Sequence, residues 1–343
     1  MEKTDLSSLT LEQLTQSVKA FGLPSFRAGQ IFRWLARGVS SFDEMSDLSK
    51  DLREKLKETC TLATVTEATC SVSSDGTKKY LFRLWDGNHV ETVLMKYEHG
   101  NSVCISSQVG CNMGCRFCAS TLKGKVRNLT AGEMLAQITY INRTDPVSHV
   151  VVMGVGEPLD NYDNLVAFIR NLTDPKGFGM SQRHISVSTC GLVPKIDRLA
   201  SEHLQITLSV SLHAPDNETR NRLMPINQTY PVEELLAACD RYLAATGRRI
   251  SYEYIMIDGV NDTSDHARLL AHRLKGKLAH VNLIPMNHVD ERDFQPSTPE
   301  RIRRFSSVLS ENGINVTCRR RLGKDIDASC GQLRARFEKE RRN

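Results

Sequence analysis

From about residue 101 the sequence alternates short runs typical of β-strands with amphipathic runs typical of helices. The strand candidates are "SVCISSQ", "HVVVMGVGE", "HISVSTC", "QITLSVSLHA", "ISYEYIMI", "HVNLIPMN" and "INVTCRRR". Repeated strand–helix units fold into a parallel sheet with right-handed crossovers. Six or seven units fall short of the eight in a closed TIM barrel. We therefore predict an α/β fold built on a partial, open, TIM-like (β/α)6 barrel.

Four segments follow from the changes in pattern along the chain. Residues 1–60 carry three amphipathic runs and predict a small helical domain. Residues 61–96 alternate polar and apolar residues around two Asp-Gly pairs, which predicts a short antiparallel extension. Residues 97–325 form the predicted barrel core. Residues 326–343 form a C-terminal segment with a cysteine and a basic tail.

Charge and hydropathy narrow the possible partners and the compartment. The chain has 343 residues and a net charge of +5, and the last 25 residues carry nine Lys or Arg against four Asp or Glu. A basic end suits a polyanion such as nucleic acid, although solvated tails share this composition. The helical domain can be an RNA-binding module or a cap on the barrel. No apolar run reaches the length of a membrane span, and the N-terminus lacks a signal-peptide pattern, so we expect a cytoplasmic protein without membrane contact.

Ten cysteines in a reduced compartment need a reason other than disulfides. Three of them, Cys111, Cys115 and Cys118, follow the first predicted strand with the spacing C-x3-C-x2-C, and Cys104 stands seven positions upstream. Thiolates favour zinc or iron–sulfur clusters, and three of them leave either site one ligand short. A zinc site would need a His or Asp from elsewhere in the chain.

The spacing C-x3-C-x2-C, with Phe117 before the third cysteine, resembles the radical S-adenosylmethionine superfamily. This resemblance implies a 4Fe–4S cluster held by Cys111, Cys115 and Cys118. Its open fourth iron would chelate S-adenosylmethionine, and reductive cleavage would yield a 5′-deoxyadenosyl radical. The protein would orient the reactants and exclude competing chemistry.

The cofactor-binding set of that superfamily can be placed at the ends of the later strands. "GVGEP" supplies Gly156 and Glu157, where glycine permits close backbone approach and the carboxylate can accept a cationic amine. The other candidates are Ser188, Asn287 in "LIPMN", and Ser211, Leu212 and His213 in "SLH". Since barrel enzymes place their chemistry at the C-terminal ends of strands, we expect these residues at one mouth. Each polar residue could also be an ordinary, satisfied group at a strand end.

Longer motifs resemble one family within this superfamily. "VETVLM", "CISSQVGCNMGCRFCAS", "RNLTAGEM", "MGVGEPLDNYDN", "SLHAPDNETRNRLMPIN", "GVND" and "DIDASCGQL" resemble the RlmN family of dual-specificity RNA methyltransferases. The resemblance runs from about residue 5 to 335. It implies formation of 2-methyladenosine in 23S ribosomal RNA, at the peptidyl transferase centre, and at adenosine 37 of a subset of transfer RNAs.

Two alternatives to this function stay open. The related Cfr family methylates C8 of the same ribosomal adenosine and confers antibiotic resistance, but "GEPLDN" favours the RlmN pattern. A remote alternative is a non-catalytic zinc-containing RNA-binding protein. Cys190 and Val155 depart from the family pattern, in which Ser and Met are frequent, and neither is a predicted ligand.

The RlmN resemblance also assigns roles to cysteines outside the cluster motif. Cys330 would take a methyl group from one S-adenosylmethionine, and a second molecule would generate the radical that activates this S-methyl group for addition to C2 of adenine. Cys104 would resolve the adduct, leaving a transient Cys104–Cys330 disulfide for an external reductant to reset. Glu91 in "VETVLM" would accept a proton, unless it is a surface carboxylate of the sheet. We expect a monomer that also needs an external electron donor.

Overall fold

The computed structural model describes residues 3–287, 291–320 and 322–326. Its centre is a ten-stranded sheet in the order β14–β13–β12–β11–β10–β9–β6–β5–β4–β3. Seven of its strands run parallel: β6 (Gly100–Cys104), β9 (Val147–Val152), β10 (Ile185–Thr189), β11 (Thr207–Ser211), β12 (Ile250–Met256), β13 (Ala279–Pro285) and β14 (Asn315–Cys318).

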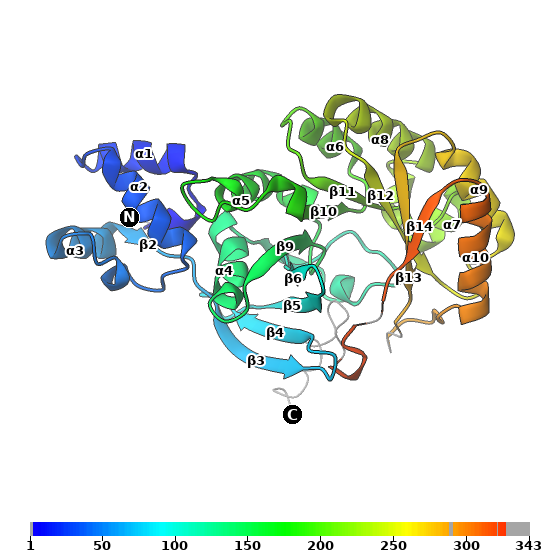
Figure 1. The fold of residues 1–343 in the computed structure, drawn as a ribbon, viewed down its shortest axis with the longest axis horizontal. Helices are drawn as coiled ribbons and strands as arrows, with labels where there is room; N and C mark the ends of the chain where they lie inside the picture. The colour runs from blue at the N-terminus through cyan, green and yellow to red at the C-terminus, as the bar shows by residue number, and fades with distance from the viewer. Residues whose placement is uncertain (1–2, 288–290, 321, 327–343) are drawn as a thin grey trace.

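A helical connection joins each parallel strand to the next, and Figure 1 shows these helices along the outside of the curved sheet. They are α4 (Ala131–Asn142), α5 (Tyr162–Thr173), α6 (Val193–Ala200), α7 (Asn217–Leu223) followed by α8 (Val232–Thr246), α9 (Ser264–Leu274) and α10 (Pro299–Glu311). β14 and β3 are the two edges of the sheet, so it is open. The predicted partial barrel of six strand–helix units is confirmed.

The alternation of apolar and polar residues along the strands decides which face meets the helices. β10 reads "ISVST" and β11 reads "TLSVS". Val187, Leu208 and Val210 are fully buried in the core beneath the helices. Because successive side chains point to opposite faces, the serines between them face the inside of the barrel. The interior is therefore lined by small polar groups.

The antiparallel extension continues the same sheet as the parallel strands. It consists of β3 (Thr66–Val72), β4 (Lys78–Arg83) and β5 (His89–Tyr97), and β5 pairs with β6 so that Val93 lies opposite Cys104. The two predicted Asp-Gly turns are present, with φ near +80° at Gly76 and Gly87. The extension joins the barrel because β6 pairs with β9 on one side and leaves its other edge for β5.

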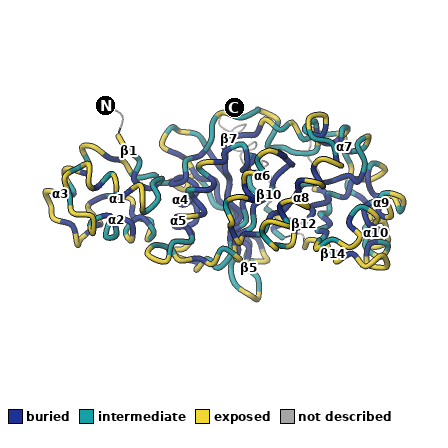
Figure 2. The backbone as a smooth tube through the Cα atoms, turned by 90° about the horizontal axis from the view of Figure 1, so that it is seen from above, coloured by how far each residue is buried: buried dark blue, intermediate teal, exposed yellow. Residues whose placement is uncertain are grey.

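The N-terminal helices form a module with its own core. They are α1 (Leu11–Ala20), α2 (Phe26–Ala36) and α3 (Lys50–Thr59), beside a short parallel pair of β1 (Thr4–Asp5) and β2 (Cys60–Thr61). Figures 1 and 2 show this module at one end of the molecule, next to α4 and α5. The Gly132 N–H donates to Ser8 Oγ at 3.0 Å, and Asn171 Nδ2 donates to the Leu9 carbonyl at 3.1 Å.

Short elements complete the chain. A hairpin of β7 (Gln108–Gly110) and β8 (Lys125–Asn128) follows β6. The 3-10 helices are η1 (Leu6–Ser8), η2 (Phe42–Glu44), η3 (Ala119–Thr121), η4 (Pro158–Asn161), η5 (Gln182–His184), η6 (Pro225–Gln228) and η7 (Lys324–Ile326). Among the described residues, none of the helices combines the length and the apolar character needed to cross a membrane.

Candidate active site

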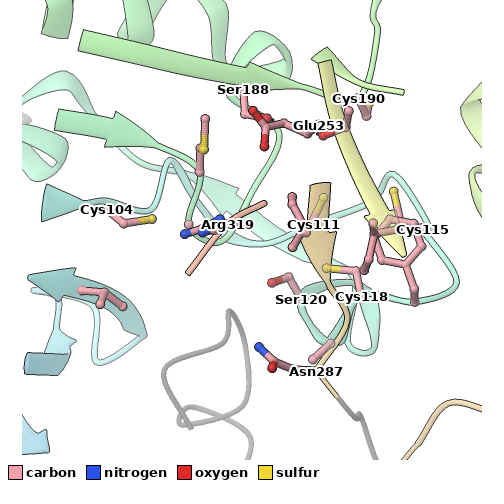
Figure 3. Close-up of a pocket in the computed structure, with 18 of the residues that line it drawn as sticks. Cys104, Cys111, Cys115, Cys118, Ser120, Ser188, Cys190, Glu253, Asn287 and Arg319 are labelled. Atoms are coloured by element: carbon pink, nitrogen blue, oxygen red, sulfur yellow. Dashed lines mark hydrogen bonds between the residues drawn. The ribbon is translucent and has the colours of Figure 1, made fainter. Parts of the chain in front are cut away.

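A cavity of about 540 Å³ opens inside the barrel, at the C-terminal ends of the parallel strands. This size suits a cofactor or a small substrate. Ten of the predicted site residues line it: Cys104, Cys111, Cys115, Cys118, Gly156, Glu157, Ser188, Ser211, His213 and Asn287. Figure 3 shows how segments far apart in the sequence meet around it. Leu212 and Glu91 are not among the lining residues, and Cys330 lies outside the described residues.

The hairpin of β7 and β8 closes the loop that carries the three cysteines. The Cys111 N–H donates to the Gly124 carbonyl at 3.2 Å. Gly110 has φ near +78°, and a Cβ there would lie 1.9 Å from the Gly124 oxygen, so only glycine fits. Thr121 Oγ1 donates to the carbonyls of Cys115 and Cys118 at 3.1 and 3.0 Å. These bonds fix the backbone and leave the thiols directed at the cavity (Figure 3).

The environment of these thiols suits a soft metal centre. Burial raises the pKa of Cys111 to about 12 and raises the pKa of Cys115 well above its usual value. A bound cationic iron centre reverses this effect, because coordination deprotonates a thiol outright. Three thiols from one loop match the ligand set of a cluster with one open position. In the described part of the chain, no three His, Cys, Asp or Glu side chains are grouped to hold a single metal ion.

The glycine-rich segment after β9 is pressed against the start of the cysteine loop. A Cβ on Gly154 would lie 2.6 Å from the Ile105 carbonyl oxygen. Gly156 has φ near +112°, and a Cβ there would lie 2.7 Å from the backbone nitrogen of Gln108. Both glycines therefore allow two strand-end loops to pack together, in addition to any contact with a cofactor.

Glu157 follows these glycines and is only 4% exposed. Its carboxylate accepts the backbone N–H groups of Leu159 and Cys190 at 3.0 and 2.8 Å. Burial raises the pKa of Glu157, and these hydrogen bonds work in the opposite direction. The carboxylate links two strand-end loops and faces the cavity, where it can accept further donors.

Ser188 and Ser211 stand side by side on neighbouring strands, with their hydroxyl oxygens 3.5 Å apart. His213 follows on the same loop with φ near +58°, which is unusual for a residue other than glycine. Its Nδ1 accepts the Ile255 N–H at 3.0 Å, so the neutral ring carries its proton on Nε2. Burial lowers the pKa of His213 to about 3. The imidazole therefore presents a neutral donor, packed edge-on against Phe117 at 4.9 Å.

Leu212 is fully buried and supports this loop from behind. Its N–H donates to the Glu253 carbonyl at 3.1 Å, so its contribution is through the backbone. Asn287 lines the cavity beyond the end of β13, across from Ser188 and Glu253 (Figure 3).

Cys104 lies at the end of β6 and is 5% exposed. It packs with Val93 and Met95 of β5 and with Leu322 after β14. Glu91 lies two residues before Val93, on the same face of the sheet, and forms a buried ion pair with Lys79 at 3.0 Å. Glu91 is 3% exposed, so it is not the surface carboxylate that was the alternative.

Two further charged residues line the cavity: Glu253, which was not singled out from the sequence, and Arg319, which belongs to the basic run predicted to contact phosphates. Glu253 on β12 accepts from Asn282 Nδ2 at 2.7 Å and from Ser251 Oγ at 3.1 Å, and burial raises its pKa. Arg319 follows β14 and is drawn between Cys104 and Cys111 in Figure 3. The sequence feature that could have indicated Glu253 is a single acidic residue within the apolar strand "ISYEYIMI". Arg319 is the first residue of the "RRR" run.

Arg220 was also missed, and it holds the rim of the cavity together. The guanidinium is fully buried and donates to the carbonyls of Cys190, Ser211 and Leu212 at 2.7, 3.2 and 3.1 Å. Burial lowers its pKa to about 10. Since a charged group is buried only where its donors are satisfied, Arg220 fixes the loops after β10 and β11 relative to each other.

Comparison with known proteins agrees with this geometry. The model of the radical SAM superfamily matches residues 105–270, and that of the ribosomal RNA large subunit methyltransferase N-terminal domain matches residues 4–62. A probable dual-specificity RNA methyltransferase RlmN of Lachnoclostridium phytofermentans is 54% identical over 98% of this chain and 96% of its own. A protein of the same description from Bacillus thuringiensis is 50% identical over 99% and 95%.

A solved structure gives the same picture. The crystal structure of a radical SAM methyltransferase from Sphaerobacter thermophilus superposes with a TM-score of 0.91 and 46% sequence identity. The alignment covers 96% of this chain and 98% of that one. The likeness therefore includes the helical module and the antiparallel extension as well as the barrel.

Proposed function

The chain belongs to the RlmN family of radical S-adenosylmethionine RNA methyltransferases, and on that premise we propose that it methylates C2 of adenosine. The proposed targets are one adenosine of 23S ribosomal RNA, at the peptidyl transferase centre, and adenosine 37 of a subset of transfer RNAs. The observation that carries the proposal is the meeting of the three-cysteine loop with Glu157, Ser188 and His213 around one cavity. Family membership sets aside the zinc-binding alternative.

Cys111, Cys115 and Cys118 would hold a 4Fe–4S cluster, which supplies the electron that cleaves S-adenosylmethionine into the initiating radical. Glu157 would accept the cationic amino group, since its carboxylate is buried and faces the cavity. Ser188, Ser211 and the Nε2–H of His213 offer hydrogen bonds to hydroxyl or carboxylate groups. Asn287 would contact the adenosine part from the opposite side.

The two thiols outside the cluster motif would carry the methyl group and release the product. Cys330 would accept a methyl group on sulfur, and the deoxyadenosyl radical would remove one hydrogen atom from it so that the carbon can bond to C2 of the RNA. The adduct would then lose the C2 proton and return one electron to the oxidised cluster. Cys104 would then attack the Cys330 sulfur and form a disulfide, while the carbon keeps the electron pair of the broken bond and takes a proton. An external thiol reductant would restore both thiols. Two S-adenosylmethionine molecules are consumed per methylation in this scheme.

Glu91 would remove the C2 proton in this scheme. Its burial beside Lys79 keeps a carboxylate on the same face of the sheet as Val93, the residue opposite Cys104. Because Glu91 does not line the cavity itself, the proton would reach it after a local rearrangement or through a water molecule.

RNA binding is proposed for the helical module as well as for the basic tail. α2 contains no acidic residue and carries Arg27 and Arg33, with Arg37 at its end. Arg27 stacks on Phe26 and Arg37 on Trp34, at 4.9 and 4.8 Å. Within the described part of the chain, no ion pair involves these arginines. Phe26 is exposed and Trp34 is half-buried, and unneutralised arginines beside such rings suit phosphates and unstacked bases.

The RNA-binding proposal can be tested by salt-dependent binding. Replacing Arg33 and Arg37 with Ala should weaken transfer RNA binding. The slope of the logarithm of the binding constant against the logarithm of the salt concentration should become shallower by about one unit per lost phosphate contact. The double variant Lys55→Ala, Lys57→Ala on α3 is the matched control. Equal salt slopes in both variants would remove α2 from the interface.

We further propose that the enzyme is a cytoplasmic monomer.

The methylation proposal is tested by reconstituting the cluster without oxygen and analysing RNA nucleosides by mass spectrometry. We expect iron–sulfur absorption and 2-methyladenosine in both RNA classes. Cys330→Ala should abolish the product and keep the cluster, and Cys104→Ala should accumulate a protein–RNA cross-link. Cys239→Ala, a buried cysteine of α8 away from the cavity, is the control. Finding 8-methyladenosine instead would contradict the assignment.

A further inference from the structure

A short segment after β14 lies against the cavity wall that contains Cys104. We call residues 322–326 the strap. Leu322 packs with Val93, Met95 and Cys104, and both Leu322 and Gly323 line the cavity. Figure 1 shows the strap passing beside the turn between β3 and β4. The strap therefore packs against the antiparallel extension, although the two segments are far apart in the sequence.

Two aspartates fasten the strap to the turn of residues 73–77, one from each side. Asp75 of the turn accepts the Gly323 N–H at 2.8 Å. Asp325 of the strap accepts from Ser73 Oγ at 2.5 Å and from the Ser74 N–H at 3.0 Å. Hydrogen bonds to carboxylates are roughly twice as strong as neutral ones. The reciprocal arrangement resists sliding of the strap in either direction.

The turn is itself a rigid anchor. The Ser73 N–H donates to the Thr77 carbonyl at 2.8 Å, and the Gly76 N–H donates to the Ser73 carbonyl at 3.0 Å. The turn leads directly into β4, which pairs with β5, and β5 places Val93 opposite Cys104. A continuous hydrogen-bonded ladder thus connects the strap anchor to the strand of Cys104.

The anchor limits how far the next part of the chain can move. Cys330 stands five positions after Asp325, which allows a reach of about 18 Å. Among the described residues, the preceding backbone bond to the barrel is the Arg319 N–H on the Leu283 carbonyl, eleven positions before Cys330. The reach then grows to about 40 Å. The effective concentration of a tethered group falls roughly as the −3/2 power of tether length, which gives a decrease of about threefold.

We propose that Asp75 and Asp325 are positioning residues: by tying the strap to the antiparallel extension they shorten the tether that leads to the Cys330 thiol, and so raise the rate at which that thiol reacts with Cys104. This rests on the proposed function, because it concerns the thiol pair of that reaction. Neither aspartate is among the residues that line the cavity. Their role is to shorten the tether, so that Cys104 meets Cys330 sulfur rather than an external thiol.

The test is the rate at which the full-length protein, with its cluster and without RNA, forms the Cys104–Cys330 disulfide. Oxidised glutathione is the oxidant, each disulfide releases two molecules of glutathione, and peptide mass spectrometry follows the pair. We expect Asp325→Ala to slow the reaction about threefold or more, and Ser73→Ala to slow it less. Asp86→Asn is the matched control, because Asp86 occupies the other Asp-Gly turn and bonds to Arg127 instead of the strap.

Two readouts separate positioning from a general loss of structure. The melting temperature and iron–sulfur absorption of Asp325→Ala should match those of Asp86→Asn. The rate at which glutathione alone modifies Cys330 should not fall. If Asp325→Ala formed the disulfide as fast as the unmodified chain, the proposed positioning role of the strap bonds would be overturned. Absence of the disulfide in the unmodified chain would instead overturn the two-thiol reaction on which it rests.

Discussion

One wall of the cavity is made by the ends of β9 to β12, and the other is made where β5 of the antiparallel extension meets β6 and the strap. The two walls present opposite chemistry. The first, the polar wall, consists of Glu157, Ser188, Ser211 and Glu253. The second, the apolar wall, consists of Val93, Met95, Cys104 and Leu322. The polar wall offers hydrogen bonds to a small molecule. The apolar wall keeps one thiol among hydrocarbon.

The difference follows from how each wall is built. Parallel strands are buried under helices on their outer face, so polar residues can be placed only at their inner face and ends. β5 lies between two antiparallel neighbours, and its cavity-facing residues Val93 and Met95 pack with Leu322 of the strap. Under the proposed function, the polar wall would bind the cofactor and the apolar wall would hold the late thiol chemistry. It predicts that mutations in the two walls give separable defects.

The largest effect is expected from a charge in the apolar wall. Val93→Asp places a carboxylate beside Cys104 at a position only 8% exposed. Its cross-strand neighbour Lys79 already pairs with Glu91, so a second buried carboxylate there costs several kcal/mol. We expect methylation to fall by more than about 100-fold, while S-adenosylmethionine binding stays within a few fold by calorimetry.

The control for this variant is Val126→Asp, which introduces the same charge at an exposed position on β8. If Val93→Asp is unfolded by circular dichroism, Val93→Thr tests the same point with a smaller perturbation. Loss of cofactor affinity equal to the loss of methylation would contradict the division into two walls.

A substitution in the polar wall should give the opposite defect, in which S-adenosylmethionine affinity falls and the thiol chemistry is unchanged. In Glu157→Gln an amide NH₂ replaces one oxygen that accepts a backbone N–H from Leu159 or Cys190. Leaving a buried donor unsatisfied costs about 1–3 kcal/mol. S-adenosylmethionine affinity should fall roughly 10- to 100-fold in calorimetry.

Glu202→Gln is the control for this substitution, since Glu202 pairs with Arg170 away from the cavity. The rate of disulfide formation between Cys104 and Cys330 should be unchanged in Glu157→Gln. A slower disulfide reaction there would mean that the two walls are mechanically coupled.

A smaller effect is expected from removing apolar contact without adding charge. Leu322→Ala should destabilise the fold by about 1–2 kcal/mol, below the usual cost for a fully buried leucine because the side chain is only partly buried. Urea unfolding measures this change. Methylation should fall severalfold with cofactor affinity unchanged. An equal loss in Leu278→Ala, an exposed leucine before β13, would show that the effect is unspecific.

The sequence predicted the polar wall better than the apolar wall, and the reason is physical. Strand-end polar residues such as Ser188 follow an apolar run, and the carboxyl ends of parallel strands meet at one edge. Their meeting around a cavity can therefore be expected from pattern alone. The cysteine loop is recognisable for the same reason, since its ligands are close in sequence.

The remaining features of the site depend on contacts between distant segments, and no short stretch of the sequence indicates these contacts. Glu253 and Arg220 face the cavity or its rim because of strand register and loop packing, and their sequence context is that of an ordinary strand and an ordinary helix. The burial of Glu91 required Lys79, a partner that only the register of β4 and β5 brings near. Strand pairing over long separations decides such contacts, and periodicity does not report it.

The strap is the extreme case, because its contacts join residues about 250 positions apart, and it yields the smallest and most specific prediction. The Gly323 N–H and the other hydrogen bonds hold the pKa of Asp75 at about 2. A carboxyl with a lowered folded pKa stabilises the fold above its unfolded value, near 3.8, and this contribution is lost as pH falls towards 2. The difference in free energy of unfolding between the unmodified chain and Asp75→Asn should therefore be constant from pH 8 to about 5 and shrink below pH 4. Urea unfolding across this range measures it. A difference that persists unchanged at pH 3 would mean that Asp75 acts through its shape in the turn and that its charge does not hold the strap.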